Sequence, residues 1–108
     1  MRKIYGLDVQ YADDLLSQAR GLMFRKSFKK ALWFRMGEKS KVMTSIHSLF
    51  VFFPFDIIWL DGKKIVDLKA NVRPWTLNVT PAKAADAFIE LPAGTIKKKK
   101  IKVGKTIF

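Results

Sequence analysis

Apolar residues occur mainly in short runs along this chain, a pattern that favours strands over long helices. The apolar run at residues 31–36 is too short for a buried helix and predicts a strand. Residues 55–60 and 64–70 flank Asp61-Gly62, and an Asp-Gly pair between two such runs predicts a β-hairpin, because both residues tolerate the positive φ of tight turns. Residues 87–92 predict another strand, which Pro92 ends. We therefore expect a mainly β domain.

The register of the hairpin stays open at this stage. A loop of two or four residues places Ile57 and Trp59 on the same face as Val66 and Leu68. A loop of three residues instead groups positions 58 and 60 with Val66 and Leu68. The pattern predicts the hairpin but not which side chains share a face.

The rest of the chain predicts one short helix and several less regular elements. Residues 2–10 alternate loosely and predict an opening strand. From residue 11 apolar positions recur at helical spacing up to Gly21, with acidic residues early and Arg20 late, which favours a short helix near the N-terminus. Residues 37–41 predict a charged turn, and residues 42–53 one or two short strands. Residues 71–81 predict a long surface connection, and residues 96–108 an edge strand with solvated lysines.

Length and composition point to one domain, residues 1–108, with nine Phe and three Trp to fill its core. The sequence has no Cys and a single His, which excludes disulfides and argues against a Cys- or His-ligated metal site, so no cofactor is expected. The longest nearly uncharged run, residues 42–60, contains His47, Pro54 and Asp56 and makes a poor membrane span. The first residues do not resemble a secretory signal, and a cytoplasmic location is expected.

The net charge of +12 changes this picture, because it will concentrate anions around the protein. Nucleic acid, acidic proteins and anionic lipid headgroups are all allowed partners. The densest basic stretch supplies the candidate anion or nucleic-acid contacts, which are Lys97, Lys98, Lys99, Lys100 and Lys102. The stretch carries no base-reading motif, so sequence-independent nucleic-acid binding competes with a simply solvated surface.

Three sequence segments occur together in a recognisable order and spacing. They read Arg-Gly-Leu-Met-Phe-Arg at 20–25, Phe-Pro-Phe-Asp-Ile-Ile-Trp-Leu-Asp at 53–61 and Glu-Leu-Pro-Ala-Gly-Thr at 90–95. In this the chain resembles the uncharacterised family called domain of unknown function 192. The resemblance implies a compact antiparallel β sandwich or barrel with one short helix near its start, and no established activity. Family members often carry an acidic residue where this chain has Lys105.

The candidate binding residues lie within or beside these segments. Arginine forks beside an exposed indole can hold a planar or anionic ligand, and Arg20, Arg25 and Arg73 with Trp75 form such a set. The competing interpretation is that the arginines pair with carbonyls or carboxylates while Trp75 covers the core. Together with His47 and Asp56, these residues motivate the first hypothesis, a non-enzymatic module that binds a small anionic or polar ligand or a protein partner.

A small hydrolase is the weakest alternative. It would use His47 with Asp56 or Glu90 as the acid-base groups, and the sequence does not show whether they meet. An Asp that caps a turn or pairs with an arginine is the more ordinary role for Asp56. The chain also lacks a phosphate-binding glycine loop. No catalytic residue is assigned.

Overall fold

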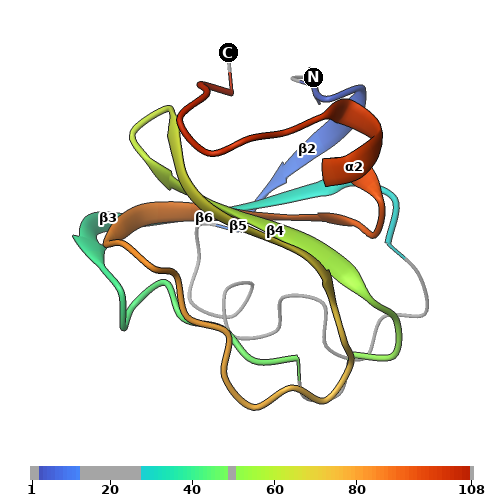
Figure 1. The fold of residues 1–108 in the computed structure, drawn as a ribbon, viewed down its shortest axis with the longest axis horizontal. Coiled ribbons are helices and arrows are strands. Elements are labelled where there is room, and N and C mark those ends of the chain that lie inside the picture. Colours follow the sequence, from blue (N-terminus) through green and yellow to red (C-terminus); the bar gives the residue numbers. More distant parts are fainter. Residues whose placement is uncertain (1–2, 13–27, 49–50, 108) are drawn as a thin grey trace.

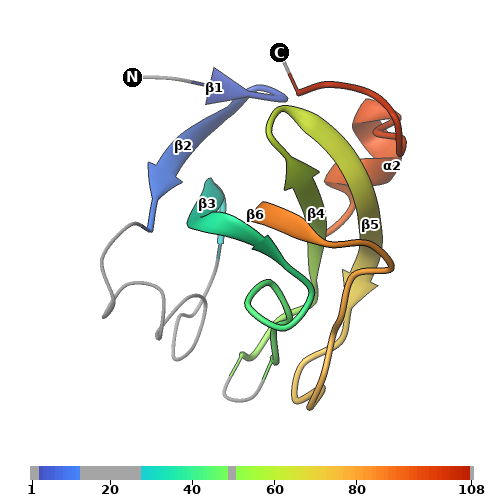
Figure 2. The ribbon, with the colours of Figure 1, turned by 90° about the vertical axis from the view of Figure 1, so that its left-hand side faces the viewer.

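The computed structural model describes residues 3–12, 28–48 and 51–107, which form one curled sheet with a short helix beside it (Figure 1). The strands are β1 (Lys3–Ile4), β2 (Leu7–Tyr11), β3 (Ala31–Ser40), β4 (Phe55–Asp61), β5 (Lys64–Val72) and β6 (Ala85–Pro92), and the helix is α2 (Thr95–Lys99). The six strands lie in the order β1-β2-β3-β6-β4-β5. Figure 2 shows the sheet curling into a half-barrel. The mainly β prediction is confirmed, but the described strands form a single curled sheet.

The pairing of the strands is mixed. β2 runs parallel to β3, with Val9 opposite Ala31, whereas the other pairs are antiparallel. The resemblance implied an antiparallel sheet, so the β2–β3 pair departs from that expectation. The parallel pair joins the β1–β2 hairpin to the rest of the sheet and places the hairpin at its edge.

The central strands are buried on both faces of the sheet. β6 lies between β3 and β4, and β4 lies between β6 and β5. Each face carries its own hydrophobic cluster, one containing Ile58 and Leu60 and the other Ile57 and Trp59. Since successive side chains of a strand point to opposite faces, a strand covered on both sides needs an unbroken apolar run. This accounts for the continuous run at residues 57–60.

The β4–β5 hairpin has a two-residue loop, one of the lengths considered from the sequence. Asp61 pairs with Lys64 and Leu60 with Ile65, but the register then shifts, and Trp59 lies opposite Asp67. This β-bulge inserts one residue into β5. As a result Val66 packs with the Ile57 cluster while Leu68 moves to the face of Ile58 and Leu60. No loop length alone could have predicted this division, because a bulge changes which face each residue occupies.

The helix of the described residues lies on the C-terminal side, and not near the start. The expected N-terminal helix falls mostly on residues 13–27, outside the described part of the chain. The edge strand expected at 96–108 is wrong over residues 96–99, which form α2. Only residues 104–107 follow β5, through a single bridge between Lys64 and Thr106 and backbone bonds to Ile65 and Lys63. Ile96, Ile101 and Ile107 are buried in the Ile58 cluster, so this segment covers one face of the sheet.

Two long loops cover the end of the sheet away from α2 and from both chain ends, as both views show (Figures 1 and 2). They comprise residues 41–48 and 73–80. In the described part of 42–53, the expected strands reduce to one isolated bridge between Ile46 and Val79. β3 continues to Ser40, through most of the turn expected at 37–41. The long connection expected after the hairpin is confirmed. In the described part of the chain, no helix has the length and apolar character that crossing a bilayer requires.

Candidate functional site

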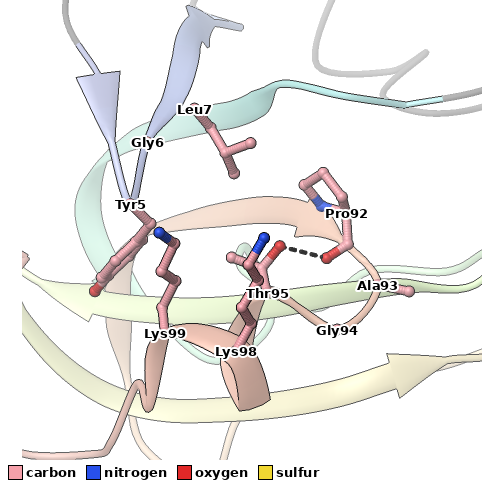
Figure 3. Close-up of a pocket in the computed structure, with 9 residues that line it drawn as sticks. All are labelled: Tyr5, Gly6, Leu7, Pro92, Ala93, Gly94, Thr95, Lys98 and Lys99. Carbon is pink, nitrogen blue, oxygen red and sulfur yellow. Dashed lines mark hydrogen bonds between the residues drawn. The ribbon is translucent and has the colours of Figure 1, made fainter.

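A pocket of about 460 Å³ lies between the β1–β2 turn and helix α2 (Figure 3). Its walls come from three segments: the β1–β2 turn, the end of β6 with the turn after it, and α2. The lining residues are Tyr5, Gly6, Leu7, Pro92, Ala93, Gly94, Thr95, Lys98 and Lys99. The volume is in the range of small-molecule sites in proteins.

Two tight backbone turns shape this pocket. Tyr5 and Gly6 both have positive φ, 49° and 79°, as the two central residues of a type I′ hairpin turn require. Gly94, with φ of 92°, redirects the chain from β6 into α2, and the Thr95 hydroxyl donates a 2.7 Å hydrogen bond to the carbonyl oxygen of Pro92. A Cβ on Gly6 would lie 3.8 Å from the Lys99 Nζ atom, so the turn and the helix approach closely.

The charge of the pocket is positive. Among the described residues, Lys98 and Lys99 are the only charged ones that line it, and Figure 3 shows both side chains rising from α2 toward the β1–β2 turn. Neither lysine makes an ion pair with a carboxylate of the described residues. Burial raises the pKa of Tyr5, and Figure 3 shows its hydroxyl on the side away from Thr95 and Pro92, so the ring and not the hydroxyl faces the pocket. The arrangement can hold a small anion by charge and hydrogen bonding.

A second pocket, of about 260 Å³, lies over β3 and β6 beside the hairpin turn and is less suited to a charged ligand. Its lining contains one base and one acid, Arg35 and Asp86. The Arg35 guanidinium stacks 4.2 Å from the ring centre of Tyr11, and the Asp86 carboxylate accepts the backbone N–H of Gly62 at 3.2 Å. Both charged groups therefore already have structural contacts.

Asp56, a candidate from the sequence, is fully buried and serves the fold. Its Oδ1 atom accepts the N–H of Asn71 and its Oδ2 atom the N–H of Ile96, each at 2.8 Å. Asn71 has a positive φ of 55°, and Ile96 belongs to the first turn of α2. The carboxylate thus anchors the end of β5 and the start of α2 to β4. This agrees with the interpretation, made from the sequence, that Asp56 caps a turn.

Three other candidates, His47, Arg73 and Trp75, lie together on the two long loops and are exposed. Ser48 joins these loops: its carbonyl accepts the N–H of Trp75 at 2.8 Å, and its Oγ atom donates to the carbonyl of Arg73 at 2.6 Å and accepts the N–H of Thr76 at 2.7 Å. The ring of Phe52 contacts Trp75 edge-on, with centroids 6.2 Å apart. The remaining candidates, Arg20 and Arg25, lie outside the described residues.

The two carboxyl groups of the hydrolase hypothesis lie on opposite faces of the sheet. Asp56 lies opposite Leu91 in the sheet, whereas Glu90 lies opposite Ile57, which places the two carboxyl groups on opposite faces. Both side chains are buried, and His47 is exposed on a loop beyond the sheet. Asp56 and Glu90 therefore do not form a carboxylate pair in one site.

The lysine-rich stretch contributes to the pocket in a way the sequence did not predict. All five candidate lysines are exposed, but Lys98 and Lys99 line the pocket while Lys97, Lys100 and Lys102 do not. Tyr5, Gly6 and Thr95 were missed entirely. The motif at 90–95 includes Gly94 and Thr95, but nothing in the sequence pairs it with the Tyr5-Gly6 turn. Among the described residues there is no cluster of three His, Asp or Glu that could hold a metal ion.

Comparison with known proteins identifies relatives over nearly the whole chain. A UPF0127 protein of Thermococcus kodakarensis is 38% identical over 100 residues, which is 92% of this chain and 62% of that protein. A UPF0127 protein of Pyrococcus abyssi is 35% identical over 92% of this chain and 83% of its own length. The chain thus spans less than two thirds of the Thermococcus kodakarensis relative.

Solved structures share the fold at low sequence identity. A crystal structure from Sinorhizobium meliloti 1021, described as a "putative transcription regulator", superposes with a TM-score of 0.82 at 22% identity and covers 91% of this chain and 78% of its own. A protein of unknown function from Novosphingobium aromaticivorans gives a TM-score of 0.79, also at 22% identity, over 91% of this chain and 71% of its own. The family model DUF192, described as "Uncharacterized ACR, COG1430", matches residues 2–108. The chain therefore belongs to the DUF192 family, as the motifs at 20–25, 53–61 and 90–95 indicated.

Proposed function

We propose that this protein is a non-enzymatic binding module that holds a small anionic ligand in the pocket between the β1–β2 turn and α2. One observation carries the proposal: two lysines and no acidic residue line the pocket among the described residues. An unbalanced pair of ammonium groups at a concave site attracts carboxylates and phosphates. The net charge of +12 adds to this attraction over a longer range.

The other walls suit a ligand with a compact body and an anionic group. Leu7, Pro92 and Ala93 supply apolar contacts, and the ring of Tyr5 adds an aromatic one. Pockets of this kind generally combine apolar walls with a few polar groups that fix the ligand's orientation. We therefore favour small organic carboxylates or phosphates over bare inorganic ions. The absence of Cys fits a reducing compartment, and the cytoplasm remains the proposed location.

The proposal is tested by titrating citrate and inorganic phosphate into the protein in a calorimeter, with Lys98→Ala and Lys99→Ala as site variants. We expect each substitution to weaken binding about fivefold to tenfold, the effect of removing one charge-assisted contact of about 1 to 1.5 kcal/mol. Lys97→Ala and Lys102→Ala remove the same charge outside the pocket and serve as matched controls, with an expected effect below twofold. Equal losses in all four variants, or no saturable binding of either anion, would contradict the proposal.

Sequence-independent nucleic-acid binding is the second candidate function. The observation that favours it is the exposure of all five candidate lysines at 97–100 and 102. Phosphate-backbone binding draws on every nearby cation, whereas the pocket draws on Lys98 and Lys99 alone. The control lysines of the titration therefore separate the two functions, because their loss would weaken nucleic-acid binding without affecting the pocket.

A further inference from the structure

Five of the six large apolar side chains that are at least half exposed in the described residues lie at one end of the molecule. They belong to the two long loops and to the segment just before β4, and we call them the loop surface: Val42, Met43, Phe52, Trp75 and Leu77. The sixth, Val103, lies near the C-terminus. Single exposed apolar residues are ordinary, but such a concentration indicates an interaction surface.

The loops that carry the loop surface are fixed by buried hydrogen bonds. Ser48 is fully buried and bonds the second loop at Arg73, Trp75 and Thr76. The indole Nε1 atom of Trp59 donates a 2.7 Å bond to the carbonyl of Thr44, which ties the first loop to β4. The fold thus presents these apolar side chains to solvent on backbone that is held in place.

The segments that carry the loop surface contain basic side chains and no acidic ones. Residues 39–55 and 68–85, which contain both loops, include no Asp or Glu. Lys41, Arg73 and Lys83 are exposed within them. A surface that combines protruding apolar side chains with basic residues and no acids is complementary to an anionic partner that is itself partly apolar.

We infer that the loop surface docks onto an anionic lipid bilayer. Trp75, Phe52 and Leu77 would enter the boundary between headgroups and acyl chains, where an indole is favoured because one part of it is apolar and the other can hydrogen-bond. Lys41 and Arg73 would then contact lipid phosphates. Neither pocket described above contains a residue of the loop surface. Protruding side chains can enter a bilayer directly, because a bilayer needs no preformed pocket to receive them.

Docking in this way leaves the ligand pocket accessible. The loops lie at the opposite end of the molecule from α2 and the β1–β2 turn in both views (Figures 1 and 2). A protein bound through the loop surface would therefore hold the pocket away from the bilayer. The inference does not depend on the proposed function, because it uses different residues at a different end of the fold.

The sequence contains a natural probe for the test. Trp33 and Trp59 are 7% and 1% exposed, whereas Trp75 is 51% exposed. A shift of the tryptophan emission on adding vesicles therefore reports Trp75. With vesicles of equal parts phosphatidylglycerol and phosphatidylcholine we expect a blue shift and quenching by brominated acyl chains. Pure phosphatidylcholine should give at least a tenfold weaker partition coefficient, because the electrostatic attraction is missing.

Matched substitutions identify the surface that binds. Phe52→Ser with Leu77→Ser should lower the partition coefficient at least tenfold, because two inserted apolar side chains are lost. Val103→Ser is the control, since Val103 is 52% exposed and lies outside the loop surface. This substitution should change the partition coefficient less than twofold. Arg73→Gln should weaken binding about fivefold. All four side chains are exposed, so the variants are expected to fold normally.

Three outcomes would overturn the inference. The first is no binding to the anionic vesicles. The second is binding that Val103→Ser weakens as much as the double substitution Phe52→Ser with Leu77→Ser does. The third is binding that causes no emission shift and is lost when Lys97 and Lys100 are substituted. That result would indicate adsorption through the C-terminal lysines. If the protein does not bind vesicles but binds an acidic protein saturably, the inference is also overturned. The loop surface would then be assigned to a protein partner.

Discussion

Asp56 illustrates how one buried residue can connect three elements. A fully buried carboxylate is costly to desolvate, and the cost is offset here by two backbone N–H donors, from Asn71 and Ile96. Asn71 lies at a register shift in β5 and Ile96 in the first turn of α2, so the Asp56 carboxylate supplies an acceptor that the strand pairing does not. The sequence favoured a turn cap or an arginine partner for Asp56, and the structure shows two backbone N–H donors.

We expect Asp56→Asn to lower the free energy of unfolding by about 2 to 3 kcal/mol, because the amide can accept only one of the two bonds and turns an N–H toward the other donor. Urea unfolding followed by circular dichroism measures the change. Asp8→Asn is the control, since Asp8 makes only an exposed 3.5 Å ion pair with Lys3, and should change the free energy by less than about 1 kcal/mol. Similar losses in both variants would argue against the anchoring role.

At the scale of elements, the two long loops and α2 owe their positions to side chains on other elements. A helix as short as α2 is not stable alone. It forms here because Gly94 turns the chain, Asp56 binds the N–H of Ile96, and Ile96 packs into the core. The loops likewise depend on Ser48, whose hydroxyl is fully buried between them. Both dependencies link residues that are far apart in sequence.

Ser48→Ala is expected to destabilise the protein by about 1 to 3 kcal/mol, because the N–H of Thr76 loses its acceptor and the carbonyl of Arg73 keeps only the Thr76 hydroxyl as a donor. Hydrogen exchange should show the Thr76 amide losing protection. Ser45→Ala provides the comparison, since its hydroxyl bonds the carbonyl of Lys41 and the hydroxyl of Thr80 at the exposed surface, and should cost less than about 1 kcal/mol. Unchanged protection of Thr76 in Ser48→Ala would contradict the proposed joining of the loops.

At the scale of the whole molecule, the charge of +12 and the core are linked through the C-terminal segment. The exposed lysines at 97–100 lie between two buried residues, Ile96 and Ile101, and the exposed Lys102 follows. Gly104 and Lys105 also form backbone bonds with Ile65. Deleting this segment would therefore expose one face of the sheet. Loss of nucleic-acid binding on deletion would not show that the lysines make the contact.

Substitution separates these effects. The triple variant Lys97→Gln, Lys100→Gln and Lys102→Gln should melt within a few degrees of the wild type, because all three side chains are exposed. If the tail contacts phosphates, the slope of log affinity for single-stranded DNA against log salt should become shallower by about 2. Fluorescence anisotropy at several salt concentrations measures it. An unchanged slope would exclude these three lysines as phosphate contacts.

The local pattern of the sequence was sufficient for the strands and for the hairpin at Asp61-Gly62. Apolar runs at 31–36, 55–60 and 87–92 became β3, β4 and β6, because a sheet strand needs little beyond its own residues and a partner. The lysines at 98 and 99 were recognised as candidate anion contacts, and the DUF192 motifs indicated the family.

Only the tertiary structure decided which residues meet. The bulge that moves Leu68 to the other face depends on how β5 fits against β4, and α2 depends on the Asp56 carboxylate. The pocket joins the Tyr5-Gly6 turn at one end of the chain to Lys98 and Lys99 at the other. Such contacts arise from packing between distant segments, and local periodicity carries no information about them. The sequence therefore specified the strands, whereas packing between distant segments placed the pocket and the loop surface at opposite ends of the fold.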